Sequence, residues 1–343
     1  MCIRDSWSTL FAHVSTDGSL WGPILEKAFA KCHGNYEHIV GGAPEIAVRT
    51  LMNWPYIDMQ HAQVEDKEAL WTQLLGHAQG SDIITAATPG SSHDNTNAQG
   101  LVNNHAYTVI GCAELSDGTR LVQVRNPWAA ESFVGAWSDG SSLWTDQAKA
   151  DVQADPHVTH WESNDDGIFF MSFDDYFEQF QWTQVNFDTA NMGESHFLML
   201  DDPAPANGNG ASWATWCGAD CTKHTLTVTS DVDQTVYLTA HTWDSRGMAR
   251  QCQDWDGKYH SIYWDGAPYY YVWKYGAKNV SVEMTAGQTI SVDVEFDFTA
   301  PEIAKDWSLV AHGANGGVTV THTDSSLTSS CLLYTSPSPR DRG

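Results

Sequence analysis

Residues 105–128 read HAYTVIGCAELSDGTRLVQVRNPW, and this stretch decides the fold of the first half of the chain. Residues 105–115 and 119–128 are rich in valine, threonine and other residues that favour β-strands. Between them lies Ser-Asp-Gly at residues 116–118, a composition typical of a hairpin turn. The pattern predicts an antiparallel hairpin in which the start of the first strand lies beside the end of the second.

This predicted hairpin places a histidine beside an asparagine. His105 begins the first strand, and Asn126 follows the last strand-like residue of the second. An asparagine carbonyl can accept the Nδ1–H of a histidine, which fixes the tautomer and orientation of the ring without adding charge. That is the orienting role in a Cys-His-Asn nucleophilic site, where the histidine activates a thiol and then protonates the leaving amine. A solvated or structural histidine is the alternative, because the chain has 15 histidines.

Patterns on both sides of the hairpin predict a mixed fold. Apolar residues recur at helical spacing over residues 19–31 and, more weakly, over residues 63–78. Residues 168–180 have strand character that passes into a short helix. After a break rich in proline, glycine and asparagine at residues 201–212, short alternating segments predict an all-β sandwich.

Composition excludes several functions. The 343 residues include 43 acidic and 17 basic side chains, a net charge of −26, so nucleic acid and anionic membranes are not expected as partners. No apolar run reaches the ~18 residues that a bilayer-spanning helix needs, so no integral membrane segment is expected. The start does not resemble a secretion signal, which favours a cytoplasmic location. No P-loop, dinucleotide fingerprint, GxSxG or HExxH motif occurs.

Four blocks, in order, resemble the calpain family of papain-like cysteine endopeptidases. LWGPILEKAFAKCHGNYEHIVGG (20–42) is similar to the helix and Gly-Gly turn that follow the nucleophile subdomain. GLVNNHAYTVIG (100–111) and VQVRNPWAAESFVGAWSDGSSLW (122–144) are similar to the segments that carry the catalytic histidine and asparagine. DDGIFFMSFDDYFEQF (165–180) resembles the segment that closes the protease core. KDWSLVAHGANGGVTV (305–320) resembles, more loosely, the closing strands of the domain after the core.

The resemblance implies an α+β fold: the C-terminal, β-rich half of a papain-like calpain protease core, followed by an all-β sandwich domain. The core would occupy residues 7–200, the linker residues 201–212 and the sandwich residues 213–325. Residues 1–6 and 331–343 resemble translated sequencing-adapter read-through and are excluded from fold reasoning. A natural Ser/Pro-rich tail is the alternative.

The resemblance also implies roles for individual residues. His105 would be the general base and acid, Asn126 its orienter, and Trp128 the indole that shields the pair from water, with core packing as the alternative for Trp128. Gly80 would line the substrate cleft through its backbone. The substrates would be proteins, cleaved through an acyl-thioester, and the chemistry requires no cofactor.

The nucleophile is missing from the place where the family has it. In calpains the catalytic cysteine lies upstream of the helix that contains Glu26, near an oxyanion-hole glutamine, and no GxCW-like motif precedes this residue. Cys2 lies in the suspected read-through, and the order of the family's segments excludes Cys32 and Cys112. The sequence is therefore expected to be a fragment without the nucleophile subdomain, inactive by itself.

Calcium is the one metal that the resemblance implies. Asp139 and Asp166 fall on acidic ligand positions of the family's calcium pattern. Ser132 and Ile168 stand where further acidic ligands are expected, and the loss of two carboxylates should greatly weaken such a site. The alternative is that Asp139 and Asp166 only make turns.

Several interpretations stay open. Cys217 and Cys221 are candidates for a disulfide, for metal ligands or for ordinary thiols. The aromatic residues of 254–276 fit a carbohydrate or peptide surface, a calcium-bridged lipid contact of the β-domain, or a cross-strand ladder. Two other functions remain possible for the whole: a calpain-like pseudoprotease or binding module that acts through the cleft or the aromatic β-domain, and an acidic carbohydrate-binding module.

Overall fold

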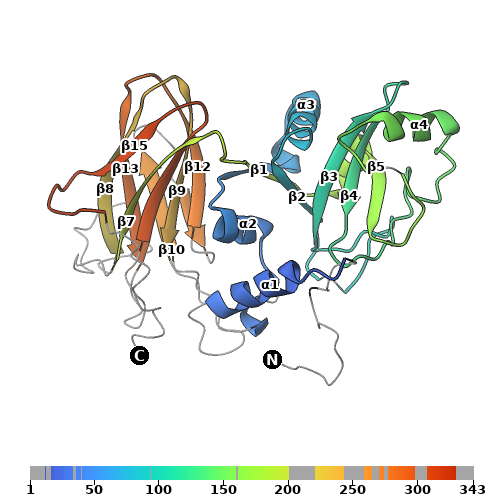
Figure 1. Ribbon diagram of the computed structural model, residues 1–343, viewed down its shortest axis with the longest axis horizontal. Helices are drawn as coiled ribbons and strands as arrows, with labels where there is room; N and C mark the ends of the chain where they lie inside the picture. Colours follow the sequence, from blue (N-terminus) through green and yellow to red (C-terminus); the bar gives the residue numbers. More distant parts are fainter. Residues whose placement is uncertain are drawn as a thin grey trace. The chain divides into compact units, whose positions relative to one another are not determined.

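The protein is a mixed α+β chain that divides into two compact units (Figure 1). The computed structural model describes residues 12, 17–33, 36–39, 41–92, 94–159, 161–200, 221–242, 259–264, 270–273, 277–297 and 307–329. One unit is Ala43–Ala190, and the other combines Met1–Gly42 with Asn191–Gly343. The expected α+β class is confirmed, because the described residues form five α-helices and three antiparallel sheets.

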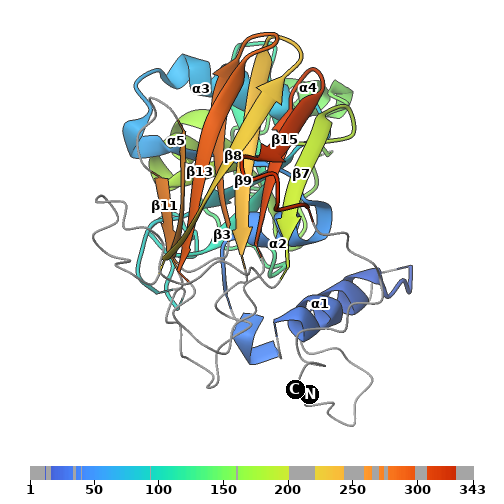
Figure 2. The ribbon, with the colours of Figure 1, turned by 90° about the vertical axis from the view of Figure 1, so that its left-hand side faces the viewer.

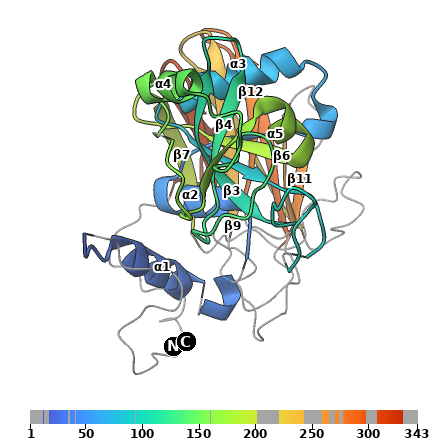
Figure 3. The same cartoon turned by 90° about the vertical axis from the view of Figure 1, so that its right-hand side faces the viewer.

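The unit Ala43–Ala190 is built on a six-stranded antiparallel sheet with the order β1-β6-β2-β3-β4-β5. Figure 3 labels its strands β3, β4 and β6 and its helices α2 to α5. Its strands are β1 Tyr56–Gln60, β2 Ile83–Ala87, β3 Ala106–Glu114, β4 Arg120–Arg125, β5 Ile168–Ser172 and β6 Trp182–Asn186. The predicted hairpin is confirmed as β3–β4, in which Thr108 pairs with Arg125 and Glu114 with Arg120. A bulge between Val109 and Gly111 interrupts this ladder.

The helices of this unit are α2 Pro44–Met52, α3 Lys67–Ala78, α4 Asp146–Ala154 and α5 Phe173–Gln179, with a 3₁₀ turn at His61–Gln63. The last three helices begin where a side chain accepts from free backbone N–H groups, whereas α2 begins at a proline and has no side-chain cap. Asp66 accepts from the backbone at the start of α3, Thr145 does so at α4, and Ser172 at α5. Helix α3 buries Leu70, Trp71 and Leu74 and packs on β2 and β3.

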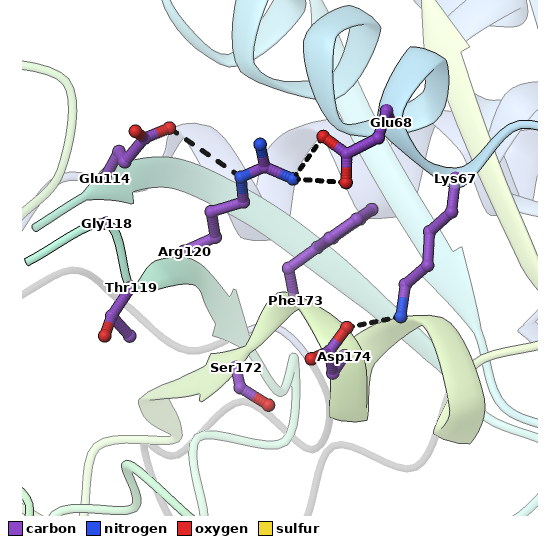
Figure 4. Close-up of a pocket in the computed structure, with 9 residues that line it drawn as sticks. All are labelled: Lys67, Glu68, Glu114, Gly118, Thr119, Arg120, Ser172, Phe173 and Asp174. Carbon is purple, nitrogen blue, oxygen red and sulfur yellow. Dashed lines mark hydrogen bonds and ion pairs between the residues drawn. The ribbon is translucent and has the colours of Figure 1, made fainter.

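Two cations tie α3 to the hairpin and to α5 (Figure 4). Arg120 Nη1 lies 2.8 Å from a Glu68 oxygen, its Nε lies 3.7 Å from Glu114, and its guanidinium lies over the Trp71 ring. Lys67 pairs with Asp174. The two cations and their carboxylate partners line a cavity of about 420 Å³, so both cations in it already face carboxylates.

The other unit contains helix α1, a 3₁₀ turn and two antiparallel sheets (Figure 2). Helix α1 is Trp21–Cys32 and the turn is Tyr36–Ile39. One sheet has the order β11-β10-β13-β8-β15 and the other β12-β9-β14-β7. The strands are β7 Gly193–Met199, β8 Cys221–Ser230, β9 Gln234–Thr242, β10 Tyr259–Trp264, β11 Tyr270–Trp273, β12 Ala277–Met284, β13 Thr289–Asp297, β14 Trp307–Gly313 and β15 Val318–His322.

Both sheets of this unit contribute to one hydrophobic core. Alternate residues of β8, such as Leu226 and Val228, are fully buried in it together with Leu238 of β9 and Leu309 of β14. The period-two pattern that predicted these strands therefore also selects the residues that meet in the core.

The expected end of the protease core at residue 200 is wrong. Strand β7 pairs along its whole length with β14, from Gly193 opposite Gly313 to Met199 opposite Trp307. Residues 193–199 therefore belong to a sheet of the second unit.

Several other sequence predictions fall outside what the structure describes. They concern the linker at residues 201–212, the read-through segments 1–6 and 331–343, Cys217, and the side chains of the aromatic stretch 254–276. Among the helices in the described ranges, none has the length and apolarity needed to cross a membrane.

A buried histidine joins three elements of the six-stranded unit. His61 is 5% exposed, and its Nδ1 lies 3.1 Å from the Phe177 carbonyl while its Nε2 lies 2.8 Å from Thr183 Oγ1. A carbonyl can only accept, so Nδ1 carries the proton and Nε2 accepts from the threonine hydroxyl. The Tyr176 hydroxyl completes the chain at 2.6 Å from Thr183 Oγ1. Burial lowers the pKa of His61 below its ordinary value of 6.5.

This burial predicts a loss of stability in acid. The unfolded chain takes up a proton at the ordinary histidine pKa whereas the folded chain resists it, so the His61 contribution is complete above pH 6.5 and is lost as the pH falls toward the lowered folded value. Urea unfolding of the wild type and His61→Gln between pH 5 and 7.5 measures this, and the wild type should show the steeper loss. The exposed His157, replaced by glutamine, is the matched control. Equal pH slopes for the wild type and His61→Gln would contradict the prediction.

The turn after β4 contains a strained alanine. Ala129 has a φ of 51°, a left-handed conformation that costs a non-glycine residue about 1 kcal/mol. We therefore expect Ala129→Gly to raise the free energy of unfolding by up to about 1 kcal/mol. The neighbouring Ala130→Gly is the control: its φ is not positive, so glycine there should only add unfolded-state entropy and lower stability. Denaturant titration distinguishes the two signs.

Candidate active site

The β3–β4 hairpin brings His105 and Asn126 into direct contact. His105 directly precedes β3 and Asn126 directly follows β4, and His105 Nε2 lies 3.0 Å from Asn126 Oδ1. An amide oxygen accepts, so this bond selects the tautomer with the proton on Nε2 and the lone pair on Nδ1. The expectation that the asparagine meets Nδ1 is wrong: the ring presents its other nitrogen.

Asn126 is held rigidly, which fixes the direction of its amide. The residue is 3% exposed. Its Oδ1 also accepts from the Trp128 N–H at 3.1 Å, and its Nδ2 donates to the Ala130 carbonyl at 3.0 Å. Its backbone N–H donates to the Gly167 carbonyl at 2.8 Å. Because oxygen and nitrogen of the amide each have a backbone partner, Oδ1 is the atom that faces the histidine.

Gly167 permits this arrangement by lacking a side chain. Its φ is 82°, and a Cβ there would lie 2.9 Å from both the Asn126 carbonyl oxygen and the Ala129 Cα. No other residue combines this conformation with so close an approach of two backbones.

Trp128 covers the histidine ring. The two ring centroids lie 4.2 Å apart with an interplanar angle of 47°, and Trp128 is 54% exposed. So large an exposed fraction does not fit the alternative of core packing. A covering indole limits the access of water to the His105–Asn126 bond, and such bonds are stronger in a low dielectric.

Gly80 is not brought to this pair. It is exposed and follows the end of α3, where its N–H donates to the His77 carbonyl at 3.1 Å. Strand β2 runs from Ile83 toward the histidine, and its last residue, Ala87, is the one that pairs with Ala106. Gly80 thus lies beyond the opposite end of β2, away from the pair, and its place in the substrate cleft stays a prediction.

Two residues that hold the histidine segment were not predicted. The Tyr107 hydroxyl accepts from the Val102 N–H at 2.8 Å, its ring meets the His105 ring edge-on, and burial raises its pKa to about 12. Thr88, directly after β2, bonds the backbone of His105. Threonine at a strand end before proline is a common turn composition, so the sequence carries no signal for either role.

Cys112 is buried completely on β3 and does not suit nucleophilic attack. Burial raises the pKa of its thiol, so the thiol stays protonated at neutral pH, and the thiolate is the reactive form. This agrees with its exclusion as the nucleophile.

Asp139 and Asp166 line one cavity of about 260 Å³. Asp139 Oδ2 accepts from the Asn164 N–H at 3.1 Å, and Asp166 Oδ1 from the Ile168 N–H at 2.9 Å. Burial, and then the Asp139 charge, raise the pKa of the nearby Glu131 to about 8. No three carboxylate, imidazole or thiol groups of the described residues converge as metal ligands. Asp166 thus makes a turn, whereas the partner of Asp139 lies 25 residues along the chain. Calcium binding by these two carboxylates stays a prediction.

Comparison of the sequence with known proteins identifies a family. Residues 3–186 match the family described as Calpain family cysteine protease. The calpain-type cysteine protease DEK1 of Arabidopsis thaliana is 39% identical over 163 residues, 46% of this chain and 7% of that protein. The calpain-type cysteine protease ADL1 of Oryza sativa subsp. japonica is 37% identical over 172 residues, 48% and 8% of the two chains. Calpain-9 of Rattus norvegicus is 28% identical over 187 residues, 51% and 26% of the two chains.

The chain therefore spans about a quarter or less of the length of these relatives. The solved structure of dimeric latent PorU from Porphyromonas gingivalis aligns at a TM-score of 0.19 and 8% identity, over 76% of this chain and 23% of that one, which supports no conclusion. The family match covers more than half of the sequence, and the chain belongs to the calpain family of cysteine proteases.

Proposed function

We propose that this chain supplies the histidine and asparagine of a cysteine endopeptidase site. The observation that carries the proposal is the 3.0 Å contact between His105 Nε2 and Asn126 Oδ1, with the asparagine amide fixed by backbone partners on both sides. A ring held this way keeps its Nδ1 lone pair as the base, because the proton on Nε2 is engaged by the asparagine.

The chemistry follows from that tautomer. His105 Nδ1 takes the proton of a cysteine thiol, and the resulting thiolate attacks the carbonyl carbon of the scissile peptide bond. The proton on Nδ1 then passes to the leaving amine as the C–N bond breaks, which leaves an acyl-thioester. Water, deprotonated by the same nitrogen, hydrolyses the thioester and restores the thiol. Asn126 is neutral, so it orients the ring without lowering the positive charge that stabilises the thiolate.

The thiol of this mechanism is assigned to a residue outside the 343-residue sequence. In the family's order of segments the nucleophile precedes the helix α1, and Cys112 is buried and protonated. The proposal therefore treats this chain as inactive by itself, and its substrates as proteins.

The remaining parts of the proposal concern the second unit and the surroundings of the protein. We infer that its two sheets form an all-β sandwich like the domain after the calpain core, supported by the single core that they share. A calcium-bridged lipid contact of this unit stays a prediction. A cytoplasmic site of action stays a prediction.

The first test is the chain by itself. Incubated with casein at neutral pH under reducing conditions, it should release no peptides. Cleavage that persists in His105→Ala would remove this histidine from the mechanism and contradict the proposal.

The second test uses a longer natural form of the protein that carries a Gly-x-Cys-Trp segment before Trp21. We expect His105→Ala to lower kcat/KM for casein by about 10³-fold or more, and Asn126→Ala by about 10²-fold, because the ring then loses its tautomer and orientation. His77→Ala is the matched control, since His77 pairs with Asp82 at 2.8 Å on another part of the same unit. Activity that is equal in wild type and His105→Ala overturns the assignment, and activity absent from both favours a pseudoprotease that binds rather than cuts.

A further inference from the structure

The end of strand β2 holds the backbone of the histidine segment through one side chain. Thr88 is 4% exposed and directly follows β2. Its Oγ1 donates to the Val102 carbonyl at 2.6 Å and accepts from the His105 N–H at 3.1 Å. Its own N–H donates to the His105 carbonyl at 3.0 Å. A hydroxyl has one proton and two lone pairs, so this single group satisfies a donor and an acceptor of the segment at once.

His105 depends on these bonds because it lies just outside the β3 ladder. The ladder with β2 begins at Ala106, which pairs with Ala87. Before it the chain turns sharply: Asn104 has a left-handed φ of 46°, and its N–H donates to the Pro89 carbonyl at 3.0 Å. The direction in which the His105 side chain leaves the backbone is therefore set at this turn. Thr88 forms hydrogen bonds with both the backbone carbonyl and the backbone N–H of His105.

We propose that Thr88 is a positioning residue that holds His105 where its Nε2 reaches Asn126. This inference rests on the proposed function, because it makes Thr88 part of a proteolytic site. The two partners have separate anchors: Asn126 is fixed from the β5 side by Gly167, and His105 from the β2 side by Thr88. Without its anchor the histidine backbone shifts, and small displacements of a reacting group cost large factors in rate.

The test reads the His105–Asn126 bond directly in the 343-residue chain. With ¹⁵N-labelled histidine, the Nε2–H signal of His105 is identified by its loss in His105→Gln. We expect Thr88→Val, which keeps the β-branched shape and removes both hydrogen bonds, to speed solvent exchange of this proton by about tenfold or more. Thr88→Ser keeps the hydroxyl and should restore the wild-type exchange rate.

Thr85→Val is the matched control. Thr85 is buried on β2, the strand that Thr88 follows, and its hydroxyl donates to Gln184 Oε1 at 3.3 Å, away from the histidine segment. The Thr85→Val variant should lower stability without changing the solvent exchange of the His105 Nε2–H. It therefore distinguishes the general effect of removing a buried hydroxyl from a specific effect on the position of His105. If valine at position 88 prevents folding, Thr88→Ala provides the same readout with a smaller side chain.

An unchanged exchange rate in a folded Thr88→Val or Thr88→Ala variant overturns the proposal, as does an equal acceleration in Thr85→Val. The measurement needs neither nucleophile nor substrate. A wrong protease assignment would therefore appear as an unaffected kcat/KM in His105→Ala, while a wrong role for Thr88 would appear only in the exchange rates.

Discussion

The antiparallel pairing of β3 with β4 is the constraint on which the site depends. Thr108 opposite Arg125 places the residue before one strand beside the residue after the other. The bulge between Val109 and Gly111 belongs to this register, and a Cβ on Gly111 would lie 2.6 Å from the His157 carbonyl oxygen. Since a shift by one residue would turn every side chain to the other face, the hairpin has essentially one register that brings His105 to Asn126.

Around this hairpin the supporting contacts are made mostly by the backbone. Asn126 is fixed by the carbonyls of Gly167 and Ala130 and by the Trp128 N–H, and His105 by Thr88. Backbone groups of a sheet move little, so bonds to them hold a side chain more firmly than bonds to flexible side chains do. A strained turn at Ala129 is tolerated in the same place, which fits the general concentration of strain near functional sites.

The sequence predicted the features that depend on neighbours along the chain and missed those set by distant ones. The hairpin and the proximity of His105 to Asn126 follow from strand pattern and a turn. Which ring nitrogen meets the asparagine depends on a side-chain rotamer that no local pattern encodes. Gly80 lies away from the pair, because closeness to a strand in sequence does not say which end of the strand meets the histidine. Residues 193–199 were misassigned because their partner strand, 307–313, lies more than a hundred residues away.

The position of β7 has a practical consequence for dissecting the protein. A cut at residue 200 would separate β7 from β14, leaving hydrogen-bonding groups on both strands without their partner. Open strand edges of this kind recruit other chains, so both pieces would tend to aggregate. A cut just after Ala190 keeps every described ladder whole, and it is the division at which each piece keeps its own sheets intact.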